Sequence, residues 1–226
     1  MTILQTEVIQ ILQRVEGVLS TAYLGLEMMR DPSGRKKDAG LRNVLVFGRS
    51  VTFVLQNLRS IESSFDDWYE PHLAKMKADP VMQYFKDARN NLEKQGRIDV
   101  KTSVSINALN DETMKLMQKT KPPGAKAMFI GDQLGGSGWE VELQDGETLS
   151  YYVDLPIEIG VVEQSFILPN SGKFNSLKNK STFELTEHFL GVLSEIVNDA
   201  NRTFADANPS QSINGRRIPS YLKVVK

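Results

Sequence analysis

The 226-residue chain contains no cysteine and only two histidines. The lack of cysteine excludes disulfides, iron–sulfur clusters, thiolate zinc sites and cysteine nucleophiles. His72 and His188 lie far apart in the sequence, and no HExxH or GxSxG motif is present. We interpret both histidines as structural or surface residues, and we expect neither a metal nor a cofactor.

An excess of one charge and a long apolar run are also missing. The 27 Lys and Arg residues balance 28 Asp and Glu residues, giving a net charge of −1, which does not predict a nucleic-acid or membrane partner. No apolar stretch reaches the ~20 residues needed to span a bilayer. The first residues lack the pattern of a signal peptide. We expect a soluble, cytoplasmic and bacterial protein without a membrane partner.

The first 96 residues follow a helical period. Apolar residues recur every three or four positions in residues 3–30 and again in residues 41–63, which predicts two amphipathic helices forming an antiparallel pair. The basic residues 35–37 are placed in the loop between them. A third helix begins at Phe65. Asp79 and Pro80 are typical of a helix start and Gly96 of a helix end, so a fourth helix is predicted between them.

After Gly96 the pattern changes to the alternation that is typical of strands. Residues 98–106 alternate, and further strands are predicted at residues 125–130, 139–143 and 149–155, with a hairpin turn at Asp145-Gly146. Ser181 and Glu184 form a capping box that opens a last helix. The predicted fold class is therefore α+β: a helical bundle in residues 1–96, then an antiparallel meander of about four strands and a C-terminal helix in residues 97–226. The two parts could share one core.

The loop that begins at Gly131 and ends at Gly138 is the stretch most similar to a ligand-binding loop. It lacks the Lys, the Ser or Thr and the following helix of a phosphate-binding loop, because Trp139 and a strand come next. One interpretation is a glycine-rich hairpin between strands. The other is a site for a small ligand or a partner, with Asp132, Ser137 and Trp139 as the binding side chains.

A lysine-rich segment offers a second candidate site. Lys173, Lys178 and Lys180 lie close to Phe174 in a stretch without acidic residues. Loops that bind nucleic acids often combine cations with an aromatic ring. This segment could therefore bind RNA or DNA, but the near-neutral charge of the whole chain argues against a dedicated nucleic-acid-binding protein.

The pair Arg89-Asn90, followed by Lys94, resembles the signature of the HEPN superfamily, helical domains found in bacterial toxins and defence nucleases. That signature is an Arg, a polar residue that is often Asn, and a later His, on a late helix of a bundle of four or five helices. The resemblance covers about the first 95 residues. It implies a helical bundle, pairing of two copies and cleavage of RNA through the 2′-hydroxyl.

Lys94 stands where the HEPN family has His. An ordinary Lys, with a pKa near 10, does not exchange protons at neutral pH unless it is strongly desolvated. Arg89 and Glu93 are also spaced for an ion pair along one helix, which would explain the arginine without chemistry. Both interpretations remain open at this point.

These observations predict a non-enzymatic, intracellular interaction protein with a HEPN-like helical half. The expected partner is another protein or a second copy of the chain, associated through the second helix, where Arg42, Arg49 and Arg59 flank the apolar stripe. One alternative is an RNA endonuclease or toxin-like defence protein with Arg89, Asn90 and Lys94 as catalytic residues. Another is a small-ligand-binding protein that uses the glycine loop.

Overall fold

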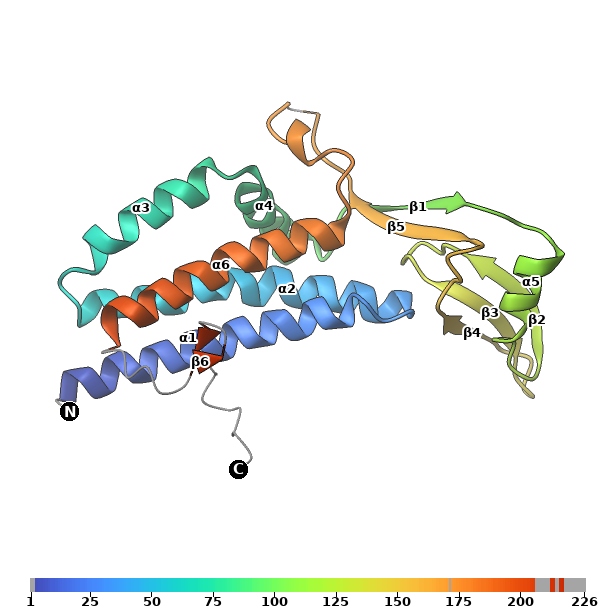
Figure 1. Ribbon diagram of the computed structural model, residues 1–226, viewed down its shortest axis with the longest axis horizontal. Helices are drawn as coiled ribbons and strands as arrows, with labels where there is room; N and C mark the ends of the chain where they lie inside the picture. The colour runs from blue at the N-terminus through green and yellow to red at the C-terminus, as the bar shows by residue number, and fades with distance from the viewer. Residues whose placement is uncertain (1–2, 171, 206–211, 214–215, 218–226) are drawn as a thin grey trace. The chain divides into compact units, whose positions relative to one another are not determined.

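The computed structural model describes residues 3–170, 172–205, 212–213 and 216–217. The chain begins with α1 (Ile3–Met28), α2 (Gly34–Leu55), the 3-10 helix η1 (Gln56–Ser60), α3 (Phe65–Ala78) and α4 (Pro80–Gln95). It continues with β1 (Val100–Ile106), α5 (Asp111–Gln118), β2 (Ala125–Ile130), β3 (Ser137–Glu142), β4 (Thr148–Val153) and β5 (Gly160–Phe166). The last elements are η2 (Asn175–Leu177), α6 (Thr182–Phe204), β6 (Ser212–Ile213) and β7 (Arg216–Arg217). The α+β class is confirmed (Figure 1).

The chain forms two compact units. The helical unit comprises Met1–Leu24, Asn43–Arg97 and Thr186–Lys226, and the mixed unit comprises Gly25–Arg42 and Ile98–Leu185. Each unit is therefore built from separate stretches of sequence. The division into domains at residues 1–96 and 97–226 stays a prediction, because a compact unit need not fold on its own.

Helix α4 begins and ends as the sequence predicts. The Asp79 side chain accepts hydrogen bonds from the backbone amides of Val81 at 2.7 Å and Met82 at 3.4 Å, and Pro80 is the first helical residue. Gly96 ends the helix with a φ of 70°, a conformation that costs a glycine little. Asp79 also contacts His188 of α6, with 2.7 Å between Oδ2 and Nε2. One carboxylate thus caps α4 and joins it to α6.

The core of the helical unit lies along α6. The rings of Phe85 and Phe189 are stacked with their centroids 4.3 Å apart, and the Tyr23 hydroxyl donates to the carbonyl of Leu190 at 3.4 Å. At the end of α6, the Asp199 carboxylate accepts from Trp68 Nε1 at 2.9 Å. Apolar residues with helical spacing on α1, α2, α3, α4 and α6 are buried: Val8, Leu12, Val15, Leu19, Val44, Val51, Leu55, Phe65, Phe85, Leu190, Leu193, Ile196 and Val197.

Helix α2 starts earlier than the sequence pattern predicts. It begins at Gly34, so the basic residues 35–37 lie in its first turns rather than in a loop, and that prediction is wrong. Asp31 Oδ1 accepts from the amide of Ser33 at 2.9 Å, which orders the chain just before the helix. Lys37 donates from Nζ to the carbonyl of Gly135 at 2.9 Å. A contact with a distant loop therefore stabilises a helical turn that local composition does not favour.

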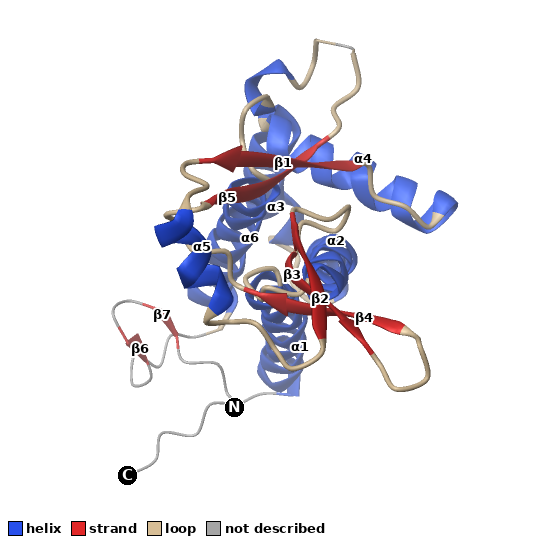
Figure 2. Cartoon of the chain, turned by 90° about the vertical axis from the view of Figure 1, so that its right-hand side faces the viewer, coloured by secondary structure: helices blue, strands red, loops and turns tan. Residues whose placement is uncertain are grey.

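The antiparallel meander is present but has three strands, in the order β2-β3-β4. The strand predicted at residues 98–106 does not join it: β1 pairs with β5, with Val100 opposite Phe166 and Ile106 opposite Gly160 (Figure 2). Alternation predicts a strand but not its partner, and this partner lies about sixty residues further along the chain. The apolar face expected for β1 is only partly covered, since Val104 is 40% exposed and Ile106 is 49% exposed.

One core cluster of the mixed unit is centred on Met117 of α5, Trp139 of β3 and Ile159, which are buried. Half-buried apolar side chains surround this centre: Ala125, Met128, Ile130, Val141, Val153 and Leu155. The predicted capping box is confirmed, because Ser181 Oγ accepts from the amide of Glu184 at 3.1 Å and the Glu184 carboxylate accepts from the amide of Ser181 at 2.8 Å. None of the described helices is both long enough and apolar enough to cross a membrane.

Candidate functional site

The HEPN-like residues are only partly brought together on α4. Arg89 pairs with Glu93 at 2.5 Å, and its Nη1 lies 3.4 Å from Asn90 Oδ1. Lys94 is exposed. The ion pair anticipated between Arg89 and Glu93 is thus present. However, Arg89 Nε is buried without a hydrogen-bond partner among the described residues, which the pair with Glu93 does not explain.

The three candidate side chains of the glycine loop make hydrogen bonds within the protein. Asp132 Oδ1 accepts from the amides of Leu134 at 2.9 Å and Gly136 at 2.8 Å, while its Oδ2 accepts from the Tyr152 hydroxyl at 2.6 Å. Ser137 Oγ accepts from the amide of Gly131 at 3.2 Å, and Trp139 Nε1 donates to Thr120 Oγ1 at 3.0 Å. Asp132 and Ser137 thus stabilise the turn between β2 and β3, whereas Trp139 bonds to the segment that follows α5.

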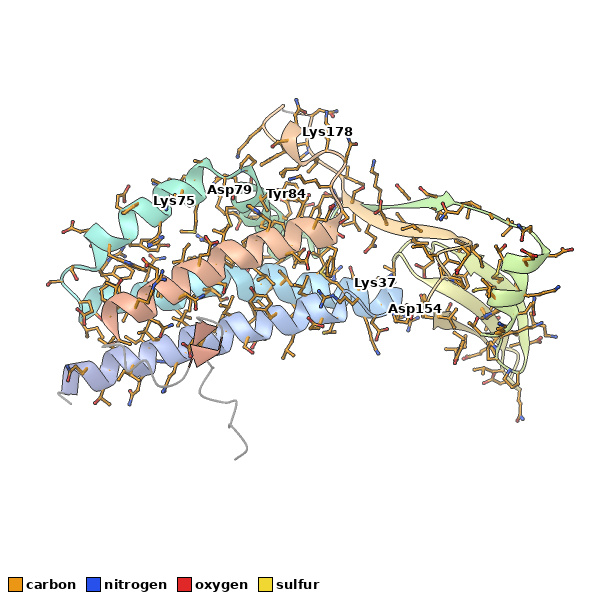
Figure 3. All side chains as sticks on the ribbon, viewed as in Figure 1. Lys37, Lys75, Asp79, Tyr84, Asp154 and Lys178 are labelled. Carbon is orange, nitrogen blue, oxygen red and sulfur yellow. The ribbon has the colours of Figure 1, made fainter. Side chains whose placement is uncertain are left out.

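The same loop packs against the start of α2. A Cβ atom on Gly34 would meet Leu134 and Asp132, and one on Gly136 would overlap the Tyr152 ring, so both glycines permit a close approach. Lys37 anchors the contact, and Figure 3 shows it beside Asp154. Burial lowers the pKa of Lys37, against the opposing effect of Asp154. These contacts give Lys37 and the loop a structural role.

The lysine-rich segment does not present its aromatic ring for stacking. Phe174 is buried, with 4% of its surface exposed, and the Lys173 ammonium lies 4.7 Å from the centre of its ring. Lys178, labelled in Figure 3, and Lys180 are exposed. A nucleic acid could meet the lysines here but could not stack a base on Phe174.

The two histidines each pair with an aspartate. His188 pairs with Asp79, as described above, and His72 Nε2 lies 3.0 Å from Asp199 Oδ2. Asp199 is further held by Trp68 and Arg202. Burial opposes ionisation of Asp199, but the hydrogen bonds from Trp68, Arg202 and His72 outweigh it and lower its pKa. Within the described residues, no group of three or more His, Asp or Glu residues is arranged to hold a metal ion.

The feature of the helical unit best suited to a ligand is a pocket of about 390 Å³, here called the arginine pocket. Its lining comes from α2, η1, α3, α4 and α6 and comprises Gly48, Arg49, Thr52, Phe53, Gln56, Arg59, Tyr69, Leu73, Met76, Lys77, Met82, Gln83, Phe85, Lys86, Phe189 and Leu193. Four of these residues are cationic, and none is acidic. Ligand sites typically combine apolar walls with a few polar groups in such a volume.

Helical spacing explains how these residues come to face one hollow. Arg49, Phe53 and Gln56 follow each other at intervals of four and three along α2 and η1, so they share one face. Tyr69, Leu73 and Met76 of α3 follow each other at the same intervals. The floor is formed by the stacked rings of Phe85 and Phe189, of which only 1% and 4% are exposed. The walls are therefore fixed by the core of the unit.

Glycine at position 48 is what allows α6 to approach α2 at the pocket floor. A Cβ atom on Gly48 would overlap the edge of the Phe189 ring. That ring cannot easily give way, because it is buried and stacked on Phe85. The glycine thus sets the depth of the pocket.

The two arginines of the pocket are held in place by local contacts. The Arg49 guanidinium lies 4.4 Å from the centre of the Phe53 ring and donates to Thr52 Oγ1 at 3.0 Å. Arg59 pairs with Asp66 at 2.7 Å. No carboxylate among the described residues pairs with Arg49, Lys77 or Lys86. Three cations therefore lie around the pocket without a neutralising charge.

Burial and like charge make Arg49 a strained cation. Burial lowers its pKa, Tyr69 opposes that effect, and the charge of Arg89 lowers it further. Burial also raises the pKa of the Tyr69 hydroxyl, against the effects of Arg49 and Arg59. Arg89 of α4 thus disfavours the charge of Arg49 of α2, although Arg89 is itself paired with Glu93, and Arg89 has the unpartnered Nε. A bound anion would relieve this repulsion.

The sequence shows the cations of this pocket but does not show that they lie close together. Arg49 and Arg59 stand on the flank of the α2 stripe, and Lys77 and Lys86 occupy similar positions on their own helices. Flanking cations usually lie in solvent, and their convergence depends on how the helices pack. Only the tertiary structure shows that they surround one hollow.

We expect Gly48→Ala to destabilise the protein by about 1–3 kcal/mol, the usual range for an overpacked core. Alanine is the better helix former by ~1 kcal/mol, so helix propensity alone predicts the opposite sign. Urea denaturation gives the free energy of unfolding. Gly191→Ala in α6 is the matched control, because a Cβ atom there meets nothing within 4 Å, and it should be neutral or stabilising. A stabilised Gly48→Ala protein would show that the Phe189 ring moves freely.

A second prediction concerns Tyr152, whose pKa is raised to about 12 by burial, the hydrogen bond to Asp132 and the charge of that carboxylate. The folded state keeps the proton at pH values where an unfolded tyrosine, with a pKa of about 10, loses it. The stability that this group contributes is complete below pH ~10 and is lost as the pH rises towards 12.

The difference in unfolding free energy between the native protein and Tyr152→Phe should therefore shrink from pH 9 to pH 11.5. The control is Tyr151→Phe, since Tyr151 is exposed and points to the opposite face of β4. Equal pH dependence for the two variants would contradict the assignment.

Comparison with known proteins gives a partial match. The family model described as bacteriophage lambda protein ea47 matches residues 31–128. Protein ea47 of Escherichia phage lambda is 36% identical over 61 residues, which are 26% of this chain and 15% of that protein. No solved structure matches. The family match spans α2 to β2 and includes every lining residue of the arginine pocket except Phe189 and Leu193 on α6. The chain is thus similar, in this region, to a phage protein.

Proposed function

We propose that the protein is a non-enzymatic binding protein whose helical unit takes a small anion with an apolar group into the arginine pocket. One observation carries this proposal. Arg49, Arg59, Lys77 and Lys86 line a hollow of about 390 Å³ that has apolar walls and no acidic lining residue. Association of two copies and a bacterial cytoplasmic location belong to the same proposal and rest on the sequence.

The energetics favour an anion over a neutral ligand. Arg49 is partly desolvated and close to Arg89, and both effects lower its pKa by disfavouring its charged form. An anion placed beside it restores the lost solvation through charge-assisted hydrogen bonds, which are about twice as strong as neutral ones. The apolar walls exclude water and strengthen these bonds. An apolar group on the ligand would gain ~25 cal/mol for each Å² it buries.

The lining supports binding rather than catalysis. General acid–base or nucleophilic catalysis needs a group such as His, Asp, Glu, Ser or Cys in a position to react. Among the described lining residues, the hydroxyl groups are those of Thr52 and Tyr69. Thr52 Oγ1 donates to the carbonyl of Arg49 at 3.1 Å, and burial raises the pKa of Tyr69. Neither group is paired with a base.

The test uses 8-anilinonaphthalene-1-sulfonate, an apolar anion that fluoresces when it is bound. We expect saturable binding to the native chain, weakened about tenfold or more by Arg49→Met and by Lys77→Met, because a hydrogen bond to a charged group contributes ~1.5–3 kcal/mol. Lys75→Met is the matched control. Lys75, labelled in Figure 3, is exposed on the same helix and does not line the pocket.

Circular dichroism must show that each variant is folded, since partly unfolded proteins also bind this dye. Equal effects of Lys75→Met and Lys77→Met would place the dye elsewhere. If the native chain shows no saturable binding of the dye, the proposal is wrong.

A second candidate function is that of a HEPN-like RNA endonuclease. The favouring observation is the buried, unpartnered Nε of Arg89, next to Arg49, which suits an arginine prepared for a phosphate. The family resemblance suggests that two copies would contribute to one site. Lys94 is exposed, so this candidate still lacks the proton-transferring histidine of the family.

If this candidate is right, the native protein cleaves single-stranded RNA. Arg89→Ala should lower the cleavage rate at least a hundredfold and leave the circular dichroism spectrum unchanged. Light scattering should also show a dimer. Arg14→Ala is the control, because the one partner of Arg14 among the described residues is the carbonyl of Gln10 on its own helix, at 3.2 Å. Absence of cleavage by the native protein, or an Arg89→Ala variant that cleaves as well as Arg14→Ala, would exclude it.

A further inference from the structure

We propose that the ligand of the arginine pocket is a nucleoside phosphate, with its phosphate among Arg49, Lys77 and Lys86 and its base against Phe53. This inference rests on the proposed function and narrows the chemical class of the anion. It depends on three features of the pocket: the number of cations, the position of the exposed ring and the two amide side chains.

The pocket has more positive charges than are required to neutralise a single carboxylate. Arg59 is paired with Asp66 at 2.7 Å, which leaves Arg49, Lys77 and Lys86 to neutralise a ligand. They come from α2, α3 and α4, so they surround a bound group from three sides. Arginine binds phosphate oxygens with a planar pair of donors, and lysine adds a mobile point charge. A doubly charged phosphate fits this set better than a singly charged carboxylate.

The ring of Phe53 is the stacking surface. Phe85 and Phe189 are buried and stacked on each other, and Tyr69 is 5% exposed, so these rings form the floor and walls. Phe53 lines the same pocket with 47% of its surface exposed. The Arg49 guanidinium lies 4.4 Å from the centre of its ring and joins the stacking surface to the phosphate-binding charge. Proteins that bind bases use such aromatic and arginine planes.

Two glutamines offer hydrogen-bond acceptors to the edge of a base. Gln56 Nε2 donates to the carbonyl of Thr52 at 3.0 Å, and Gln83 Nε2 donates to the carbonyl of Met76 at 3.1 Å. These bonds fix both amides with the nitrogen toward the backbone, so the oxygens are left to accept. Gln83 Oε1 already lies 3.4 Å from Lys86 Nζ, whereas Gln56 Oε1 has no partner among the described residues. An amino group on adenine or cytosine would satisfy Gln56, and uracil has none.

The polar lining also argues against a long aliphatic anion. The tail of a fatty acid would need a uniformly apolar channel, and here Thr52, Gln56 and Gln83 interrupt the apolar walls. Burying these groups against methylene carbons would leave their remaining hydrogen-bonding capacity unused, which is unfavourable. The cavity of about 390 Å³ lies within the range for small-molecule sites.

The experiment is isothermal titration calorimetry on the full chain with adenosine 5′-monophosphate, uridine 5′-monophosphate, adenosine, inorganic phosphate and octanoate. We expect adenosine monophosphate to bind at least tenfold more tightly than adenosine, phosphate or octanoate, and several-fold more tightly than uridine monophosphate. Phe53→Ala and Lys86→Met should each weaken its binding about tenfold, since one stacked ring or one charged contact contributes that much. Lys75→Met should leave the affinity unchanged.

The outcomes separate this inference from the proposed function. If octanoate or the sulfonate dye binds in the pocket and adenosine monophosphate does not, the nucleotide is wrong and the anion pocket stands. If adenosine monophosphate binds with an affinity that Phe53→Ala and Lys86→Met leave unchanged, the inference is wrong because the nucleotide binds elsewhere. If no anion binds, both proposals fall.

The source of the nucleoside phosphate is distinguished by a further titration. A 5′-phosphorylated adenine tetranucleotide presents the same end group as part of a single-stranded nucleic acid. Tighter binding than the mononucleotide, with stronger salt dependence, would indicate a nucleic-acid end as the natural ligand. Equal or weaker binding would indicate a free nucleotide. Both results support the proposed pocket, because the mononucleotide and the tetranucleotide present the same base and phosphate to it.

Discussion

The contact between Gly48 of α2 and Phe189 of α6 is the constraint on which the helical unit depends. It allows the Phe189 ring to lie across α2 and stack on Phe85 of α4, with 4.3 Å between the ring centroids. This joins three helices that are far apart in the sequence. A glycine inside a helix costs ~1 kcal/mol relative to alanine, and here that cost is offset by close packing. The same contact forms the floor of the arginine pocket.

At the pocket, packing of the apolar residues partly removes neighbouring cations from water, although cations are most stable when they are solvated. Met76 and Phe85 are buried in the core of the helical unit, and the next residues on their helices are the cations Lys77 and Lys86. Packing the helices brings these cations together, with Arg49 partly buried and close to Arg89. Structures rarely keep such a group uncompensated, and functional sites are where they do. The proposed anion resolves the conflict.

In the mixed unit, the candidate binding residues make hydrogen bonds within the protein, and their part in binding a ligand stays a prediction. Asp132, Ser137 and Trp139 use their polar atoms to hold the turn between β2 and β3 and its neighbours. Lys37, which local pattern placed in a loop, donates to the carbonyl of Gly135 and orders the first turns of α2. Glycine-rich loops allow close packing as readily as they allow ligand binding, and sequence alone does not distinguish the two.

The sequence by itself determined the features that depend on neighbouring residues. The α+β class, the capped ends of α4, the capping box before α6, the hairpin between β3 and β4 and the ion pair of Arg89 with Glu93 all follow from local spacing. Only the tertiary structure decided that β1 pairs with β5 and that Lys37 anchors a loop nearly a hundred residues away. It also decided that Arg49, Lys77 and Lys86 converge on one pocket. The physical reason is that periodicity reports which side of an element is apolar, whereas pairing and convergence depend on which distant surfaces pack together.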